Sequence, residues 1–181
     1  LARWNGSAWS SVGGWLTSGG ELTLVADGHS LLVLGYFDEV GPASIPSPRV
    51  ARWDGSSWQA MGSCPIPGVA ACAARVGGTL YVGGESSGSG FDSPLVAWDG
   101  SDWTPVPGID EPGGSPASIT ELVGVGGTLY AAGNFVSLEG ATVPAKFLGA
   151  WDGAAWSAPG NGEIDDATHV AYVFVSDCDA L

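Results

Sequence analysis

Three acidic residues close together, Glu163, Asp165 and Asp166, are the best candidates for metal ligands in this sequence, and they follow an Asn-Gly dipeptide. Calcium prefers several oxygen ligands, commonly presented by a turn that contains glycine. The pattern therefore suggests a calcium site. The competing interpretation is a solvated acidic turn, because the pairs Asp38-Glu39 and Asp110-Glu111 occur in other connections and indicate an acidic rim. No other cofactor is indicated.

The cysteines offer a second kind of chemistry. Of the three in the chain, Cys64 and Cys72 enclose the turn-forming stretch Pro65–Gly68. A disulfide between them would close this loop in an oxidising compartment. The alternative is a pair of ordinary buried thiols. Zinc is not indicated, because neither His29 nor His169 lies at a ligand spacing from any cysteine.

Motifs for common catalytic chemistry are absent from the sequence. It contains no nucleophile elbow, no phosphate-binding P-loop, no zinc-protease motif and no EF-hand loop. The glycine pairs Gly77-Gly78 and Gly126-Gly127 separate apolar runs and do not precede a helix, which predicts hairpin turns. Two histidines are too few for a copper site built from several of them. These features favour a non-catalytic protein.

The charge of the chain excludes other classes. Nineteen acidic residues face five basic ones, for a net charge of −14, and the basic residues are scattered. Nucleic acids and anionic membranes recruit clusters of lysine and arginine, so we exclude both as partners. No apolar run approaches the roughly 20 residues that span a bilayer, so membrane insertion is not expected either.

A phrase of two tryptophans separated by four residues is the feature of the sequence that says most about its fold. It occurs four times, at Trp4–Trp9, Trp53–Trp58, Trp98–Trp103 and Trp151–Trp156. This spacing of copies predicts a repeat architecture. The Asp-Gly or Asn-Gly after the first tryptophan is expected to reverse the chain, because both residues tolerate left-handed backbone geometry. The two indoles would then lie opposite each other on neighbouring strands. We expect these pairs to fill the space between successive repeats.

Each repeat is predicted to contain four short antiparallel strands. In the third repeat they are residues 119–125, 128–135, 147–151 and 155–158, and the first and second repeats follow the same order. Four such strands in about 45 to 50 residues are typical of a β-propeller blade. The predicted fold is therefore all-β, a β-propeller built of four-stranded antiparallel blades.

Residues 1–181 are expected to form a single propeller array. It would comprise a half-blade (1–13), three blades (about 19–62, 68–108 and 117–160) and a second half-blade (166–181). The two half-blades either combine to close a four-bladed ring or belong to a larger propeller. The tail Asp177–Leu181 is too short to supply a second strand and its connection, which favours a piece of a larger propeller. An open array would expose a strand edge and allow self-association.

One segment carries a family resemblance. Leu80-Tyr81-Val82-Gly83-Gly84, followed by Trp98 and Trp103, resembles a kelch repeat, in which a double glycine closes the second strand and two aromatics follow. The chain is similar to the kelch-like W-D-G-x-x-W repeats of secreted and cell-surface proteins, including the ectodomains of fungal cortical polarity markers. The resemblance implies a propeller in an extracellular or cell-surface location. The double glycine is replaced by Leu34-Gly35 and Ala132-Gly133 in the other repeats.

Differences between the repeats concentrate in four connections, Phe37–Pro48, Glu85–Pro94, Ile109–Pro116 and Val136–Pro144. Variable connections on a repeated frame are where binding residues commonly lie. We therefore expect a non-catalytic binding or scaffold module that contacts a protein or glycan partner. Two alternatives remain open. One is a fragment of a propeller enzyme, a glycan-active hydrolase or lyase whose catalytic residues lie outside this chain. The other is a structural repeat array of a cell surface or matrix.

Overall fold

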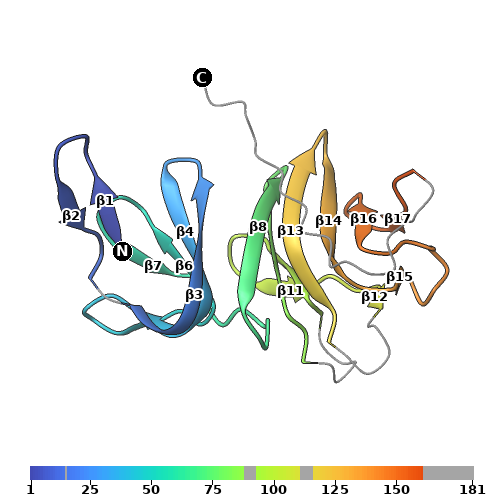
Figure 1. Cartoon of the computed structure of the whole chain (residues 1–181), viewed down its shortest axis with the longest axis horizontal. Coiled ribbons are helices and arrows are strands. Elements are labelled where there is room, and N and C mark those ends of the chain that lie inside the picture. The colour runs from blue at the N-terminus through green and yellow to red at the C-terminus, as the bar shows by residue number, and fades with distance from the viewer. Residues whose placement is uncertain (15, 88–92, 111–115, 161–181) are drawn as a thin grey trace. The chain divides into compact units, whose positions relative to one another are not determined.

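The computed structural model confirms the all-β class (Figure 1). It describes residues 1–14, 16–87, 93–110 and 116–160, and within these ranges every regular element is a strand. None of the described residues forms a helix that could cross a membrane. The chain forms two compact units, an N-terminal unit of residues 1–64 and a C-terminal unit of residues 65–181.

The N-terminal unit contains a hairpin and one larger antiparallel sheet. In the hairpin, β1 (Ala2–Trp4) pairs with β2 (Trp9–Ser11). The sheet has the order β3-β4-β6-β7, and the short β5 pairs with the end of β4. Its strands are β3 (Leu16–Asp27), β4 (Ser30–Val40), β5 (Ile45–Pro46), β6 (Val50–Trp53) and β7 (Trp58–Ala60). A buried cluster on this sheet comprises Val33, Phe37, Val40, Ala51 and Trp58.

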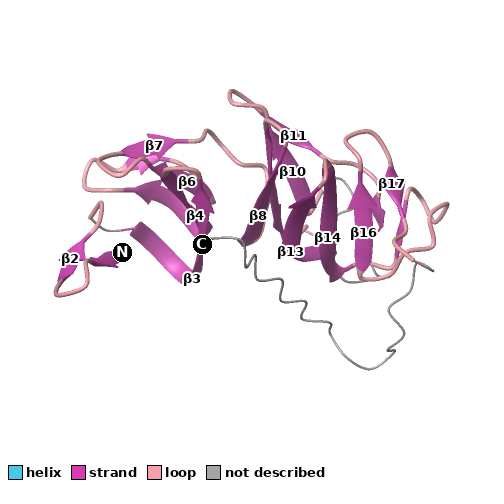
Figure 2. Cartoon of the chain, turned by 90° about the horizontal axis from the view of Figure 1, so that it is seen from above, coloured by secondary structure: helices cyan, strands magenta, loops and turns pink. Residues whose placement is uncertain are grey.

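The C-terminal unit contains two four-stranded antiparallel sheets that lie side by side (Figure 2). The first has the order β8-β9-β10-β11, with strands β8 (Ala70–Val76), β9 (Thr79–Gly84), β10 (Leu95–Trp98) and β11 (Trp103–Pro105). The second has the order β13-β14-β16-β17, with strands β13 (Ser118–Val125), β14 (Thr128–Asn134), β16 (Leu148–Trp151) and β17 (Trp156–Ser157). The short strands β12 (Ile109–Asp110) and β15 (Ser137–Leu138) pair with each other.

The core of the C-terminal unit lies between its two sheets. Strand β13 packs against β8 and β9. Cys72 and Tyr81 from the first sheet are buried in the same cluster as Ile119, Leu129 and Trp156 from the second. Each sheet therefore buries an apolar face against its neighbour, which is the usual way that sheets gain stability.

The strands predicted for the third repeat are confirmed as β13, β14, β16 and β17. The predicted turn at Gly126-Gly127 is also confirmed, because Val125 pairs with Thr128 on either side of it. In the first repeat the corresponding turn contains one glycine instead of two. Asp27 pairs with Ser30 in the ladder, so the turn is Gly28-His29.

A glycine near the end of the second strand is required by close backbone packing. Gly35, Gly84 and Gly133 occupy this place in the three repeats, and each lies beside a register shift in the pairing with the first strand. A Cβ atom on Gly133 would collide with the carbonyl oxygen of Ser118 and lie 2.8 Å from Ile119 Cα. The bulged first strand leaves no room for a side chain there. This explains why the second glycine is kept in all three repeats, whereas the first is replaced in two.

Candidate functional site at the loop end of the sheets

Each four-stranded sheet has one end with tight turns and one end with long connections, because its strands are antiparallel. The tight turns, which define the turn end, are the two-residue hairpins and the Trp–Trp phrases. The long connections follow the second strand of each repeat or lead into the next repeat, as residues 41–49, 139–147 and 106–117 do. We call this the loop end.

Asp54 shows how a phrase turn is built. Its Oδ1 accepts hydrogen bonds from the main-chain N–H groups of Ser56 and Ser57, both at 2.8 Å. The N–H of Asp54 donates to the Ser57 carbonyl, and Gly55 has φ 101°. Of the two residues expected to tolerate left-handed geometry, only the glycine has a positive φ. The carboxylate stabilises the turn by accepting hydrogen bonds.

The same turn recurs in the other phrases, where Asn5, Asp99 and Asp152 accept from the N–H groups two and three residues later at 2.8–2.9 Å. Hydrogen bonds to a carboxylate stabilise its charged form. These hydrogen bonds therefore hold the pKa of Asp54, Asp99 and Asp152 below the ordinary value. The N–H three residues later makes the larger contribution, and the N–H two residues later makes the smaller one. These acids serve the turns and are not candidates for proton transfer.

The predicted pairing of the indoles is confirmed. In every phrase the first tryptophan lies directly opposite the second, with ring centroids 5.0–5.5 Å apart. Trp151 and Trp156 belong to the core shared by the two sheets of the C-terminal unit, as expected for indoles that fill the space between repeats. Trp4 and Trp9 depart from that expectation, because they are 51% and 70% exposed.

In two of the four phrases the second tryptophan also makes a hydrogen bond that the sequence did not predict. Trp58 Nε1 donates to the Gly13 carbonyl at 2.7 Å, and Trp156 Nε1 donates to the Pro107 carbonyl at 2.8 Å. Each acceptor lies four residues after the second tryptophan of an earlier phrase. The indole therefore ties the outer hairpin of a repeat to the segment that leads into that repeat. A glycine or proline at this spacing was the available sequence signal.

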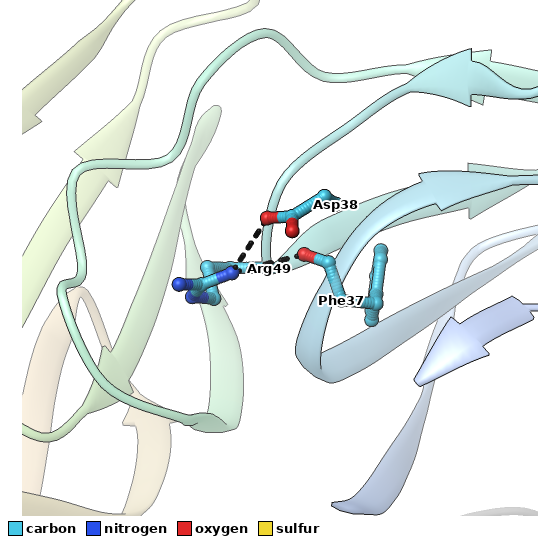
Figure 3. Close-up of polar contacts among 3 residues, drawn as sticks. All are labelled: Phe37, Asp38 and Arg49. Carbon is cyan, nitrogen blue, oxygen red and sulfur yellow. Dashed lines mark hydrogen bonds and ion pairs between the residues drawn. The ribbon is translucent and has the colours of Figure 1, made fainter. Parts of the chain in front are cut away.

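Arg49 closes the base of the long connection in the N-terminal unit (Figure 3). Its Nη1 donates to the Phe37 carbonyl at 3.0 Å and to Asp38 Oδ1 at 3.1 Å. The guanidinium lies 4.0 Å from the ring centroid of Tyr36, a cation–π contact. Tyr36 is 48% exposed, and the Asp38 side chain is also exposed. The aromatic ring and the acid are exposed, whereas the Arg49 side chain is only 13% exposed.

Ser47 holds the same connection from inside. It is fully buried, and its N–H donates to the Asp38 carbonyl at 2.9 Å. Its hydroxyl donates to the Val50 carbonyl at 2.6 Å and accepts from the Met61 N–H at 3.1 Å. Residues 42–44, in contrast, are exposed. The connection is thus fixed at its base while its tip is exposed to solvent.

Asp110 performs the corresponding task in the C-terminal unit. Its Oδ2 accepts from the Ser137 hydroxyl at 2.7 Å and from the Ala141 N–H at 2.9 Å, and its Oδ1 accepts from the Gly140 N–H at 3.3 Å. Asp110, predicted as part of an acidic rim, therefore anchors a connection. Its neighbour Glu111 lies outside the described residues.

Unusual backbone geometry gathers in these connections. Five non-glycine residues in the described part of the chain have positive φ: Ser44 (48°), Arg49 (69°), Glu139 (55°), Ala141 (66°) and Phe147 (66°). All five lie in the connections at residues 41–49 and 139–147. Such geometry is unfavourable by about 1–3 kcal/mol per residue and clusters at functional sites. The loop end of the sheets in each unit is therefore the best candidate for a functional site.

The candidate calcium ligands Glu163, Asp165 and Asp166 lie outside the described residues, as does His169. Where the structure describes the chain, no group of three or more histidine, cysteine or acidic side chains is placed to hold a metal ion. His29 is an exposed turn residue.

The structure shows Cys64 and Cys72 as buried free thiols, which is the alternative interpretation, and not as the suggested disulfide. Cys72 Sγ lies 3.6 Å from the Ile119 carbonyl oxygen, inside the core between the two sheets. Its side chain therefore serves packing between repeats instead of closing a loop. Burial raises the pKa of the Cys72 thiol well above its ordinary value, and the charge of Glu121 acts in the same direction. This thiol is not a nucleophile.

No protein-family model matches the chain, and no curated protein matches it. The functional interpretation therefore depends on the geometry of the chain itself.

Proposed function

We propose that the chain is a non-catalytic binding module, a kelch-like propeller array that contacts a protein or glycan partner through its loop end. The three larger sheets are its blades, and the hairpin β1–β2 is a half-blade. The location is extracellular or at a cell surface, as the resemblance to W-D-G-x-x-W repeats implies.

The proposal is carried by one observation, the gathering of all described positive-φ non-glycine residues in two connections at the loop end. Strained loops are kept where a fixed shape is needed, and a preformed surface loses little conformational freedom when it binds. The anchoring of these connections by Ser47 and Asp110 supports the same interpretation.

The chemistry of the first connection suits a polar partner. Tyr36 and Arg49 are residue types that contribute strongly to binding, and here they are stacked on each other. The half-exposed Tyr36 side chain and the exposed Asp38 carboxylate offer both apolar contact and hydrogen bonds. Glycans and protein surfaces both present such groups.

Glycan arrays and pull-down from extracellular fractions test the proposal with the 181-residue chain. One variant replaces residues 41–46 with a short Gly/Ser connection, and a second does the same at residues 139–144. The matched control replaces Gly77-Gly78, a turn at the opposite end, with Asn-Gly. We expect binding to be lost in at least one loop variant and kept in the control.

Two results would contradict the proposal. A partner that binds all three variants equally would place binding away from the loop end. Hydrolysis of a glycoside panel by the full-length protein would favour the enzyme alternative.

A further inference from the structure

One of the four phrase turns differs chemically from the rest. Asn5 occupies the place that Asp54, Asp99 and Asp152 hold in the other three phrases. Because its Oδ1 accepts the same main-chain hydrogen bonds as their carboxylates, the turn requires an acceptor oxygen, which an amide also supplies. The two groups differ in reactivity, since a neutral amide carbon is open to nucleophilic attack and an ionised carboxylate resists it. The lowered pKa of the three aspartates keeps them ionised.

The main-chain nitrogen of Gly6 is the nucleophile next to this amide in the covalent chain, and attack by it on Asn5 Cγ closes a succinimide ring. Among the described residues, none accepts a hydrogen bond from the Gly6 N–H. Gly6 is exposed, and a Cβ built on it would meet nothing within 4 Å. The nitrogen therefore gives up no hydrogen bond when it attacks, and no side chain obstructs it.

The hydrogen bonds of the turn favour the attack. Asn5 Oδ1 accepts from the Ser7 N–H at 2.9 Å, from the Ala8 N–H at 2.9 Å and from the Ser7 hydroxyl at 3.0 Å. When the Gly6 nitrogen adds to Cγ, negative charge develops on this oxygen, and donors already in place stabilise it. Asn5 Nδ2 has no hydrogen-bond partner in the part of the chain that the structure describes, so it is free to leave.

The openness of the turn is a property of the phrase and not of its place in the chain. Strand β13 packs against the sheet β8-β9-β10-β11, yet the turn of that sheet is exposed at Asp99 and Gly100. A Cβ on Gly100 would also meet nothing within 4 Å, and its N–H has no acceptor in the described ranges. The turn at Asn5 and Gly6 is therefore expected to be open beside a neighbouring repeat as well.

We propose that Asn5 is a site of spontaneous deamidation in the folded chain, with water as the co-reactant. Hydroxide removes the Gly6 N–H proton, the nitrogen bonds to Asn5 Cγ, and the Cγ–Nδ2 bond breaks as Nδ2 takes a proton from water and leaves as ammonia. Water then opens the succinimide. Cleavage of the new bond at Cγ gives aspartate, the residue of the other three phrases. Cleavage at the main-chain carbonyl gives isoaspartate, which lengthens the main chain by one carbon atom.

Peptide mapping by mass spectrometry tests the proposal on the 181-residue chain after incubation at mildly alkaline pH. The peptide that contains Asn5 should gain the mass of an amide-to-acid conversion, at a rate proportional to hydroxide concentration. Isoaspartyl methyltransferase identifies the isoaspartate fraction. Asn134 is the internal control, because it is exposed but is followed by phenylalanine and should keep its amide. Mapping separates Asn5 from Asn161, which also precedes a glycine but lies outside the described residues.

Moving the amide to another phrase tests whether the turn itself supports the reaction. The Asp54→Asn variant has the same hydrogen-bond donors available at Ser56 and Ser57, so it should convert at position 54 at a rate similar to that at position 5. Circular dichroism checks that the chain stays folded during incubation. The proposal is overturned if Asn5 keeps its amide for as long as Asn134 does. It is also overturned if a synthetic peptide of residues 1–11 deamidates while the folded chain does not, because the turn would then protect the amide.

Discussion

Replacing Gly133 with alanine should destabilise the C-terminal unit through a collision between backbones. A Cβ at this position meets the Ser118 carbonyl oxygen and lies 2.8 Å from Ile119 Cα, whereas ordinary contacts are 3.4–4 Å. Neither obstacle is the movable end of a side chain, so β13 or β14 must shift. Overpacking of this kind lowers the free energy of unfolding by about 1–3 kcal/mol, and we expect a value near the upper limit.

Two alanine substitutions in the same unit calibrate this effect. Gly78→Ala places its Cβ in open space without a left-handed backbone, so it should be neutral or stabilise by about 0.5 kcal/mol through the unfolded chain. At Gly83 the Cβ would lie 2.6 Å from Ile119 Cγ2, a side chain that can move, and the loss should be intermediate. Urea unfolding followed by circular dichroism gives the three values. The reasoning is refuted if Gly133→Ala unfolds within about 0.5 kcal/mol of Gly78→Ala.

Three further predictions follow from the phrase turns and the core. Trp156→Phe keeps an aromatic ring but leaves the Pro107 carbonyl without its donor, so urea unfolding should show a free energy of unfolding lower by about 1–3 kcal/mol. Trp9→Phe changes an exposed residue, so its free energy of unfolding should stay within about 0.5 kcal/mol of that of the parent at low protein concentration. The folded pKa of Asp152 is lowered, so its stabilisation is complete above the ordinary value of 3.8 and is lost as pH falls through the folded value. Asp152→Asn should therefore weaken the acid dependence of the urea midpoint, and an unchanged dependence would contradict this explanation. Cys72 should resist a thiol reagent in the folded chain and react once urea is added, as followed by peptide mapping. Rapid labelling of the folded chain would show that the thiol is accessible.

The strands and the indole pairs were predictable because they depend on local spacing. Two tryptophans separated by a four-residue turn must face each other across a hairpin, and Trp53 and Trp58 do so. The carboxylate hydrogen bonds of Asp54 are local as well, but the Asp-Gly pattern was interpreted through backbone preference alone, so the acceptor role was missed.

Long-range and strained features were not predictable from the pattern. The carbonyl that receives the Trp156 N–H is 49 residues away in sequence, and only the fold brings the two together. Ser44 and Arg49 have left-handed backbones although neither is glycine, so their residue types do not predict this geometry. The differences between the connections are visible in the sequence, but their strain and their anchors emerged only from the structure.

Hydrogen exchange of the indole N–H groups, measured by NMR on a dilute sample, tests most directly whether the indole pairs join each outer hairpin to the segment that leads into its repeat. Single Trp→Phe variants assign the signals. Buried, hydrogen-bonded groups exchange only when the structure opens. The Trp58 and Trp156 indoles should therefore exchange far more slowly than that of Trp4. Equally fast exchange at all three would contradict the account.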